Sequence, residues 1–363
     1  MSHRYICNDH IEPLLEQLSS DFKVKKIGDS ENDEPIFSVQ FGNGSKKILL
    51  WSQMHGNEST TTKALFDLFN CIEQAKPHFD TILSNTTITV IPILNPDGAR
   101  VYTRVNTNDI DLNRDAAALT QRESRLLRKL FEEIEPDFCF NLHGQRTIFS
   151  AGKANKPATV SFLAPAEDQK RSLTKTRKVA MQLIAKLNDN LQNQIPDQVG
   201  RYDDAYHPNC VGDTFQGLGV PTILFEAGHY TDDYERDTTR FYIFQSLLLS
   251  LNTIANETID GNAYKSYFNI PENEKLFFDI IVRNGLVDGN LVDVAVQYQE
   301  VLVNNEIIFQ PKIEKIGDLS RFYAHKSIEA NKHPILTHDN ETLFVGYEND
   351  FVLKNNEKLT LIV

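Results

Sequence analysis

The alternation of short apolar runs with amphipathic segments is the feature that most restricts the fold of this 363-residue chain. Four predominantly apolar runs are typical of strands that are covered on both faces of a sheet. They occupy residues 47–51, 87–94, 137–142 and 220–225. Apolar residues recur with helical spacing at residues 62–76, 121–134, 167–194 and 232–255. This alternation predicts an α/β fold, in which a mostly parallel sheet is wrapped by helices on both sides.

The character of the chain changes near residue 262. Beyond it the helical period disappears, and short β-rich runs appear, separated by Asn, Asp and Gly. A chain of this length accommodates one large α/β domain and a smaller module. We therefore expect an α/β domain over residues 1–262 and a small all-β domain over residues 263–363, whose role the sequence does not indicate.

The composition excludes several classes of partner. The chain has 37 basic and 50 acidic residues, a formal net charge of −13, and no long run of Lys or Arg that would hold a phosphate backbone. No apolar run approaches the ~18 residues of a membrane span. The N-terminus, MSHRYICNDHIEPLLEQL, lacks the apolar core of a signal peptide. We expect a cytoplasmic protein with no nucleic-acid or membrane partner.

Polar side chains follow the apolar runs at the point where each run ends. His55 and Glu58 follow the first run, and His143 follows the third. The carboxyl ends of parallel strands meet at one edge of a sheet, so these side chains can converge. Two imidazoles and one carboxylate are a ligand set of catalytic zinc, which lowers the pKa of a bound water to about 7 and polarises a carbonyl. Each motif by itself is common by chance.

Glu226 ends the fourth run, where neighbouring apolar residues would remove its carboxyl group from water. Burial raises the pKa of a carboxyl group, which suits a residue that takes up a proton and later releases it. An ordinary Glu at a strand end, paired with an Arg, is the alternative.

The segment 95–115 concentrates arginine and asparagine in an otherwise acidic chain. An Arg that follows Asn in a loop, such as Arg114 after Asn113, suits bidentate capture of a carboxylate, although surface ion pairs would also explain these arginines. Asp111 is placed to accept the free ring N–H of a zinc-bound histidine and so fix its tautomer.

Taken together and in order, these motifs resemble the zinc metallocarboxypeptidases. The sequence has HxxE at 55–58, NPDG at 95–98, TRVN at 103–106, DLNR at 111–114, and then the strand-end histidine and glutamate. The resemblance covers residues 45–230. It implies a three-layer α/β/α sandwich around a mixed, mostly parallel twisted sheet of about eight strands, and one Zn²⁺ per chain.

The resemblance also implies roles for individual residues around the metal. His55, Glu58 and His143 are expected to bind zinc. Glu226 is expected to act as general base and then as general acid. Asp111 is expected to be the hydrogen-bond partner of His55.

Other residues are expected to act on the substrate. By resemblance, Arg104 holds the oxyanion that develops from the scissile carbonyl, and Asn113 and Arg114 clamp the terminal carboxylate. The family covers its bound substrate with a mobile tyrosine, for which Tyr202 and Tyr206 are the candidates. Counting back from the catalytic glutamate favours Tyr206.

The tetrapeptide HGNE at 55–58 departs from the digestive members of the family, which have Arg where this chain has Asn57. HGNE is typical of the related desuccinylase and aspartoacylase branch, which cleaves N-acyl amino acids and tends to carry a C-terminal β domain. The NPDG turn and the TRVN segment favour the carboxypeptidase side. We therefore expect a metallocarboxypeptidase acting on small peptides.

Two alternatives remain open. One is an N-acyl amino acid amidohydrolase, which hydrolyses the same kind of bond. The other is a non-catalytic, zinc-stabilised binding protein, which predicts loss of Glu226 or Arg104, although both are present.

Overall fold

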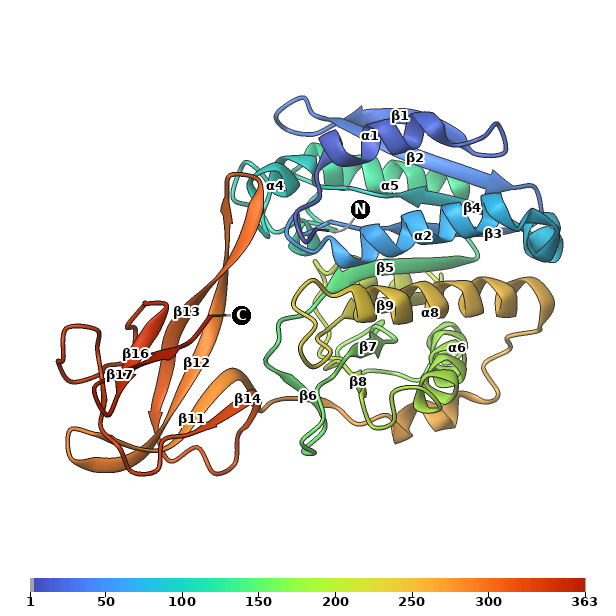
Figure 1. The fold of residues 1–363 in the computed structure, drawn as a ribbon. Coiled ribbons are helices and arrows are strands. Elements are labelled where there is room, and N and C mark those ends of the chain that lie inside the picture. The colour runs from blue at the N-terminus through green and yellow to red at the C-terminus, as the bar shows by residue number, and fades with distance from the viewer. Residues whose placement is uncertain (1–2, 363) are drawn as a thin grey trace.

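The computed structural model describes residues 3–362, so residues 1–2, with which the expected α/β domain begins, and residue 363, with which the expected C-terminal domain ends, lie outside the described residues. An eight-stranded sheet with the order β1-β2-β4-β3-β5-β9-β7-β8 forms the larger part (Figure 1). Its strands are β1 Lys23–Asp29, β2 Pro35–Gly42, β3 Lys46–Trp51, β4 Thr86–Ile91, β5 Phe138–Gly144, β7 Val160–Leu163, β8 Val199–Arg201 and β9 Thr222–Ala227.

The sheet is mixed, as the sequence predicts. β4, β3, β5 and β9 lie side by side in parallel, and β7 pairs in parallel with β8. The pairs β1–β2, β2–β4 and β7–β9 are antiparallel. The central strands are the four predicted apolar runs, because only strands covered on both faces lack polar alternation.

Helices cover both faces of the sheet. On β3, Ile48 and Leu50 face one core and Leu49 and Trp51 face the other, as the two-residue period of a strand requires. The first core includes residues of α1, α2, α6 and α8, and the second includes residues of α5 and α7. The helices are α1 Asn8–Gln17, α2 Thr60–Gln74, α3 Asp80–Asn85, α4 Pro96–Val101, α5 Arg122–Ile134, α6 Lys175–Gln192, α7 Val211–Gly217 and α8 Asp237–Asn256, with 3₁₀ turns η1 Lys76–Phe79, η2 Leu112–Arg114 and η3 Tyr264–Asn269.

Two helices begin later than the apolar period suggests. The predicted helix 167–194 begins at Lys175, where the Thr174 side chain caps its first turn. The predicted helix 232–255 begins at Asp237, because the Asp233 carboxylate accepts the backbone N–H groups of residues 237–239. Among the described residues, no helix combines the length and apolar character needed to cross a membrane. The cytoplasmic location stays a prediction.

The C-terminal part is rich in strands, as expected. One sheet has the order β13-β12-β11-β14, and a smaller one has the order β15-β16-β17. The bounds are β11 Phe277–Val287, β12 Asn290–Val303, β13 Glu306–Gly317, β14 Tyr323–Glu329, β15 Ile335–Leu336, β16 Phe351–Lys354 and β17 Glu357–Thr360. These strands enclose a hydrophobic core of their own. β10 (Asn273–Lys275) instead pairs with β6 (Phe149–Ala151) of the N-terminal part, and the boundary after residue 262 stays a prediction.

The C-terminal sheet faces the carboxyl edge of the main sheet. On β12, Glu300 forms an ion pair with Arg4 at 2.7 Å. Also on β12, Gln297 donates to the hydroxyl of Thr147, which follows β5. The space between the two parts therefore opens at the edge where polar side chains leave the parallel strands.

Candidate active site

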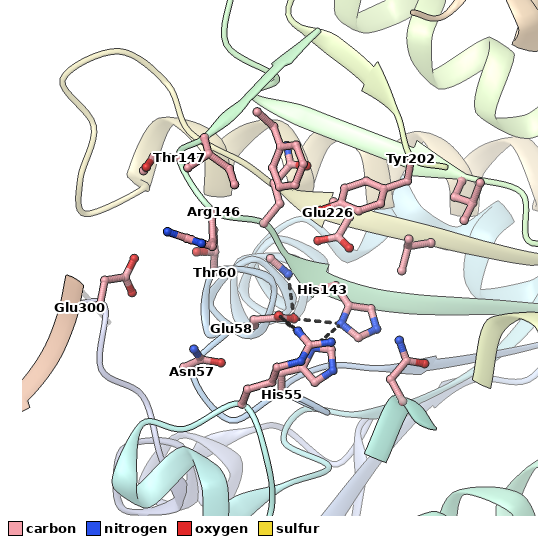
Figure 2. A pocket seen from close by; sticks show the side chains of 18 of the residues that line it. His55, Asn57, Glu58, Thr60, His143, Arg146, Thr147, Tyr202, Glu226 and Glu300 are labelled. Atoms are coloured by element: carbon pink, nitrogen blue, oxygen red, sulfur yellow. Dashed lines mark hydrogen bonds and ion pairs between the residues drawn. The ribbon is translucent and has the colours of Figure 1, made fainter. Parts of the chain in front are cut away.

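A cavity of about 610 Å³ lies at this edge. His55, Glu58, His143 and Glu226 line it from the main sheet, and Glu300 lines it from β12 (Figure 2). The cavity is thus bounded by both parts of the chain. The clustering of strand-end side chains that the sequence predicts occurs at this place.

His55 and Glu58 lie in the short loop that joins β3 to α2, on either side of Gly56. A Cβ atom at Gly56 would lie 2.0 Å from the carbonyl carbon of Gly98, so the loop packs directly on the backbone of α4. Glycine is required here for this close approach. This contact fixes the backbone of the loop between His55 and Glu58.

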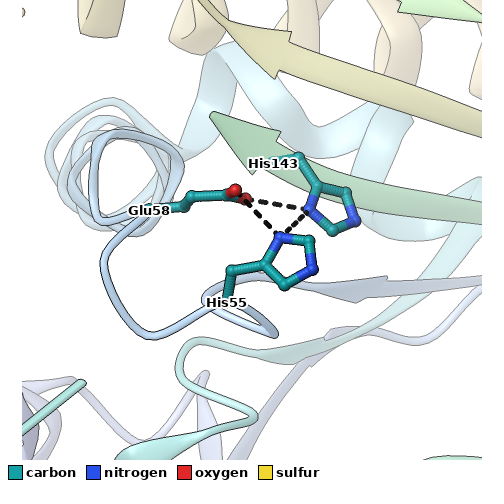
Figure 3. Close-up of side chains that lie close together, drawn as sticks. All are labelled: His55, Glu58 and His143. Carbon is teal, nitrogen blue, oxygen red and sulfur yellow. Dashed lines mark hydrogen bonds and ion pairs between the residues drawn. The ribbon is translucent and has the colours of Figure 1, made fainter. Parts of the chain in front are cut away.

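His55, Glu58 and His143 converge closely enough to share one cation (Figure 3). One potential ligand atom from each residue lies within 4.8 Å of the other two. The Nδ1 atom of His143 lies 2.9 Å from a carboxylate oxygen of Glu58 and 3.0 Å from Nδ1 of His55. Gly144 N–H also donates to this Glu58 oxygen, which orients the carboxylate.

The donor set fits a zinc ion. Asp111 lies 3.0 Å from Nε2 of His55, and Nδ1 of the same ring faces Glu58 and His143. Two ring nitrogens that face each other beside a carboxylate are the arrangement that a cation satisfies. His55, Glu58 and His143 are the residues that would hold it.

Glu226 lies directly opposite His143 in the pairing of β5 with β9. Burial raises the pKa of Glu226 well above its ordinary value, and the nearby Glu58 carboxylate adds to this effect. Glu58 is equally buried, but its two histidine neighbours lower its pKa. Oε2 of Glu226 also has no hydrogen-bond partner. Because their pKa values are shifted in opposite directions, Glu226 takes up a proton more readily than Glu58 does.

Arg104 lies beside the cluster. Its guanidinium is 3.4 Å from a Glu58 oxygen and 3.0 Å from an Asp111 oxygen, and its side chain remains 48% exposed. A positive charge is therefore held next to the cluster, at the surface of the cavity. The oxyanion role expected for Arg104 and the orienting role expected for Asp111 stay predictions.

Asn113 and Arg114 both line the cavity. The side-chain oxygen of Asn113 accepts the N–H of Val211, which turns its NH₂ group away from that contact. Arg114 is exposed and donates to the carbonyl of Asn113. Within residues 3–362, no carboxylate forms an ion pair with Arg114, so its guanidinium is available to a ligand.

Of the two candidate tyrosines, Tyr202 lines the cavity and Tyr206 is absent from its wall. Tyr202 stands close to Glu226 (Figure 2), and burial together with that carboxylate raises its pKa. The assignment of Tyr206 as the covering residue counted only sequence distance, which does not show the path of the loop. Its role stays a prediction, and Tyr202 occupies the wall in this structure.

Several residues that line the cavity could not be predicted from sequence motifs. Arg4, Arg236 and Glu300 come from the N-terminus, the start of α8 and β12, and Arg146 follows β5. Arg146 lies only three residues after the predicted metal ligand His143, and this short spacing is the one sequence feature that could have predicted its place at the cavity. The others belong to no motif, and only the tertiary structure brings them to the cavity.

The chain shares sequence with proteins of known class. Residues 8–244 match the family model for zinc carboxypeptidase. The chain is 27% identical to carboxypeptidase SOL1 of Arabidopsis thaliana over 128 residues, 32% of this chain and 26% of that protein. It is 32% identical to gamma-D-glutamyl-L-diamino acid endopeptidase 1 of Lysinibacillus sphaericus over 83 residues, 21% of each protein. The matches thus span about a quarter of the length of these relatives.

Solved structures share the fold. A metallo-carboxypeptidase from Burkholderia cenocepacia superposes with a TM-score of 0.54 at 17% identity, over 68% of both chains. Carboxypeptidase A from Helicoverpa armigera superposes with a TM-score of 0.55 at 14% identity, over 69% of this chain and 74% of that one. The predicted architecture is confirmed, and the family and the His-Glu-His cluster agree on one zinc ion as the cofactor. This chain belongs to the zinc carboxypeptidase family.

Proposed function

We propose that this protein is a zinc-dependent carboxypeptidase that hydrolyses the C-terminal amide bond of small peptides. The observation that supports this most strongly is the shared cavity. It holds the His55, Glu58 and His143 cluster, a buried carboxyl group at Glu226 and an unpaired guanidinium at Arg114. A C-terminal peptide needs all three: a metal site, a proton carrier and an anion clamp.

The residues divide the chemistry between them. Zinc held by the cluster supplies a Lewis acid that polarises the scissile carbonyl. Glu226, whose pKa is raised, takes a proton from the attacking water and delivers it to the leaving amine. Arg104 stabilises the negative charge that develops on the carbonyl oxygen, because its guanidinium is already held beside the cluster.

Asn113 and Arg114 select substrates that end in a free carboxylate. A guanidinium without an acidic partner binds a carboxylate through two parallel hydrogen bonds. The Val211 contact directs the Asn113 amide, so its NH₂ group adds a further donor. Blocking the terminal carboxylate as an amide removes this recognition. We propose Tyr202, which stands on the cavity wall, rather than Tyr206, as the tyrosine that contacts the bound substrate.

A second candidate function is hydrolysis of N-acyl amino acids. It is favoured by Asn57, which replaces the arginine of the digestive enzymes and lines the cavity with its side-chain oxygen unpaired. Without that arginine, the chain has one contact fewer for an extended peptide backbone. Both candidates hydrolyse an amide next to a free carboxylate, and they differ only in what lies on the acyl side.

The test is metal analysis of the purified protein, followed by incubation with two matched panels. One panel contains peptides with varied C-terminal residues, each also as its C-terminal amide. The other contains N-acyl forms of the same residues. We expect one zinc per chain and cleavage of free-carboxylate peptides only. Cleavage restricted to the N-acyl panel would establish the second candidate, and no cleavage of either panel would contradict both.

A further inference from the structure

Arg236 differs from the other buried arginines of the chain. Arg4, Arg177 and Arg236 are each at most 5% exposed. Arg4 pairs with Glu300 at 2.7 Å, and Arg177 pairs with Asp204 at 2.5 Å. Within the described residues, Arg236 forms no ion pair, although a buried charge is strongly destabilising unless it is paired.

Arg236 lines the cavity, and its contacts do not satisfy all of its donors. Its Nη1 atom donates to the carbonyl of Ala227 at 2.7 Å, the residue after Glu226. Its Nε atom is buried without any hydrogen-bond partner. Burial, followed by the positive charge of Arg4, lowers the pKa of Arg236 to about 10. A bound anion would therefore stabilise the buried, unpaired charge of Arg236.

A second unpaired guanidinium lies close by. The Ala227 carbonyl that accepts from Arg236 also accepts the backbone N–H of Gln145, the neighbour of Arg146. Arg146 is exposed, lines the cavity and has no carboxylate within ion-pair distance in residues 3–362. Figure 2 shows it beside Thr60 and Thr147, on the side of the cluster that faces Glu300.

The acids on this wall are already engaged by other groups. Glu300 accepts from Arg4 and from the hydroxyl of Tyr102. Asp279 accepts from the hydroxyl of Tyr234, the backbone of Tyr298 and the amide of Gln297, and burial raises its pKa to about 6. Glu300 attracts Arg236 electrostatically, but within the described residues neither acid forms an ion pair with Arg236 or Arg146.

Arg146 and Tyr202 lie on different sides of the metal-binding cluster (Figure 2). The side-chain oxygen of Asn113 accepts the N–H of Val211, the first residue of α7. In the chain, α7 follows the segment that contains Tyr202. Arg114, Arg146 and Arg236 line the same cavity, so a substrate whose terminal carboxylate is bound by Arg114 has the other two arginines within that cavity for its acyl side.

We propose that Arg236 and Arg146 form a second anion subsite, which selects substrates with a carboxylate on the acyl side of the scissile amide. This inference rests on the proposed function for its orientation. The carboxylate belongs either to an acidic residue or to an N-acyl group that ends in a carboxyl. Its substrates thus carry negative charge at both ends of the bond that is cut.

The test uses the zinc-loaded full chain and substrate pairs that differ by one charge. N-acetyl-glutamyl-alanine is compared with N-acetyl-glutaminyl-alanine, and N-succinyl-alanine with its succinamoyl counterpart. The measured quantity is the ratio of kcat/KM within each pair. We expect the acidic member to be preferred by about tenfold or more, because a carboxylate forms stronger hydrogen bonds to a guanidinium than a neutral amide does. The pair with the larger ratio identifies the source of the carboxylate.

Variants assign the preference to the two arginines. Arg236→Gln and Arg146→Gln should each lower the ratio toward one, and Arg236→Lys should restore part of it. Arg125→Gln, a surface arginine on α5, is the matched control and should leave the ratio unchanged. Arg146 is exposed, so its substitution tests the proposal even where Arg236→Gln fails to fold. A wild-type ratio near one, or a ratio that both Gln variants retain, would overturn it.

Binding separates this inference from the proposed function. Calorimetric titration of the Glu226→Gln variant with the same pairs measures affinity without turnover. If no peptide is cut but the acidic members bind about tenfold more tightly, the subsite stands and the carboxypeptidase proposal fails. If peptides are cut and the pairs bind equally, the carboxypeptidase proposal stands and the subsite fails.

Discussion

The two walls of the cavity bury charge in different ways. On the main-sheet wall, His143 Nε2 and Glu226 Oε2 have no hydrogen-bond partner. On the wall next to β12, Glu300 is held by Arg4 and Tyr102, and Asp279 by three donors. Arg236 differs from Arg4 on that wall, because its guanidinium has no acidic partner among the described residues and its Nε atom is buried and unpaired.

This difference separates polar groups that act on a ligand from those that support the structure. Buried polar groups are normally satisfied, because an unsatisfied one is destabilising. A buried atom that stays unpaired in a cavity is therefore a candidate for ligand binding. An ion pair such as Arg4 with Glu300 instead fixes the C-terminal sheet against the main sheet. Substitutions on the first wall should change activity, and those on the second should change stability.

The largest effect is expected from His143→Ala. Removal of a ligand should reduce bound zinc from about one per chain to a trace, since a catalytic zinc site relies on only three protein ligands. Activity should disappear with the metal. Metal analysis after dialysis measures the change, and His229→Ala, which alters another buried histidine, is the control. Full zinc retention by His143→Ala would show that the ligand assignment is wrong.

Glu226→Gln should keep zinc and lose activity by about 10²- to 10⁴-fold, the range for loss of a general acid–base. The amide cannot take up the proton that the raised pKa of Glu226 favours. Glu300→Gln, the corresponding change on the opposite wall, should reduce kcat/KM by less than about tenfold. Equal losses in the two variants would remove the distinction between the walls, and unchanged turnover would remove Glu226 from the mechanism.

Glu300→Gln should lower the free energy of unfolding by about 3–5 kcal/mol, because it leaves Arg4 buried without its acidic partner. Replacing both residues, as Arg4→Met with Glu300→Leu, should recover most of that loss. Urea unfolding measures both variants and each single replacement. A double variant as unstable as the sum of its singles would show that the pair does not act as one unit.

The smallest effect is a dependence of stability on pH. Burial raises the pKa of Asp279 from 3.8 to about 6, so the folded state holds its proton more tightly than the unfolded state. This contribution to stability is present below pH 4 and is lost as the pH rises through 6. The total is about 3 kcal/mol at most, at 1.36 kcal/mol per pKa unit.

Asp279→Asn removes this ionisation, so its stability should decline less between pH 4 and pH 7 than that of the wild type. His325, whose pKa burial lowers to about 4, contributes with the opposite sign, but it is present in both proteins and cancels in the comparison. Denaturant unfolding at the two pH values gives the difference. Parallel pH profiles would contradict the shifted pKa.

Local pattern was sufficient to predict the main-sheet wall. Ligands that follow strand ends in one parallel sheet must meet, so His55, Glu58, His143 and Glu226 could be brought together from their order alone. The late starts of α6 and α8 could not be predicted from periodicity, because single capping side chains decide them. β1 was also missed, since its sequence KVKKIGD shows little of the apolar alternation that marks a strand.

The sequence alone determined the α/β architecture, the order of the motifs and the family resemblance, because these depend on short-range periodicity and on residues that lie at the ends of strands. Only the tertiary structure decided that β12 closes the cavity and that Tyr202 stands on its wall. It also decided that Arg236 is buried without an acid while Arg4 and Arg177 are paired. The physical reason is that burial and pairing depend on contacts between residues far apart in the chain, such as Arg4 and Glu300, and no local pattern encodes them.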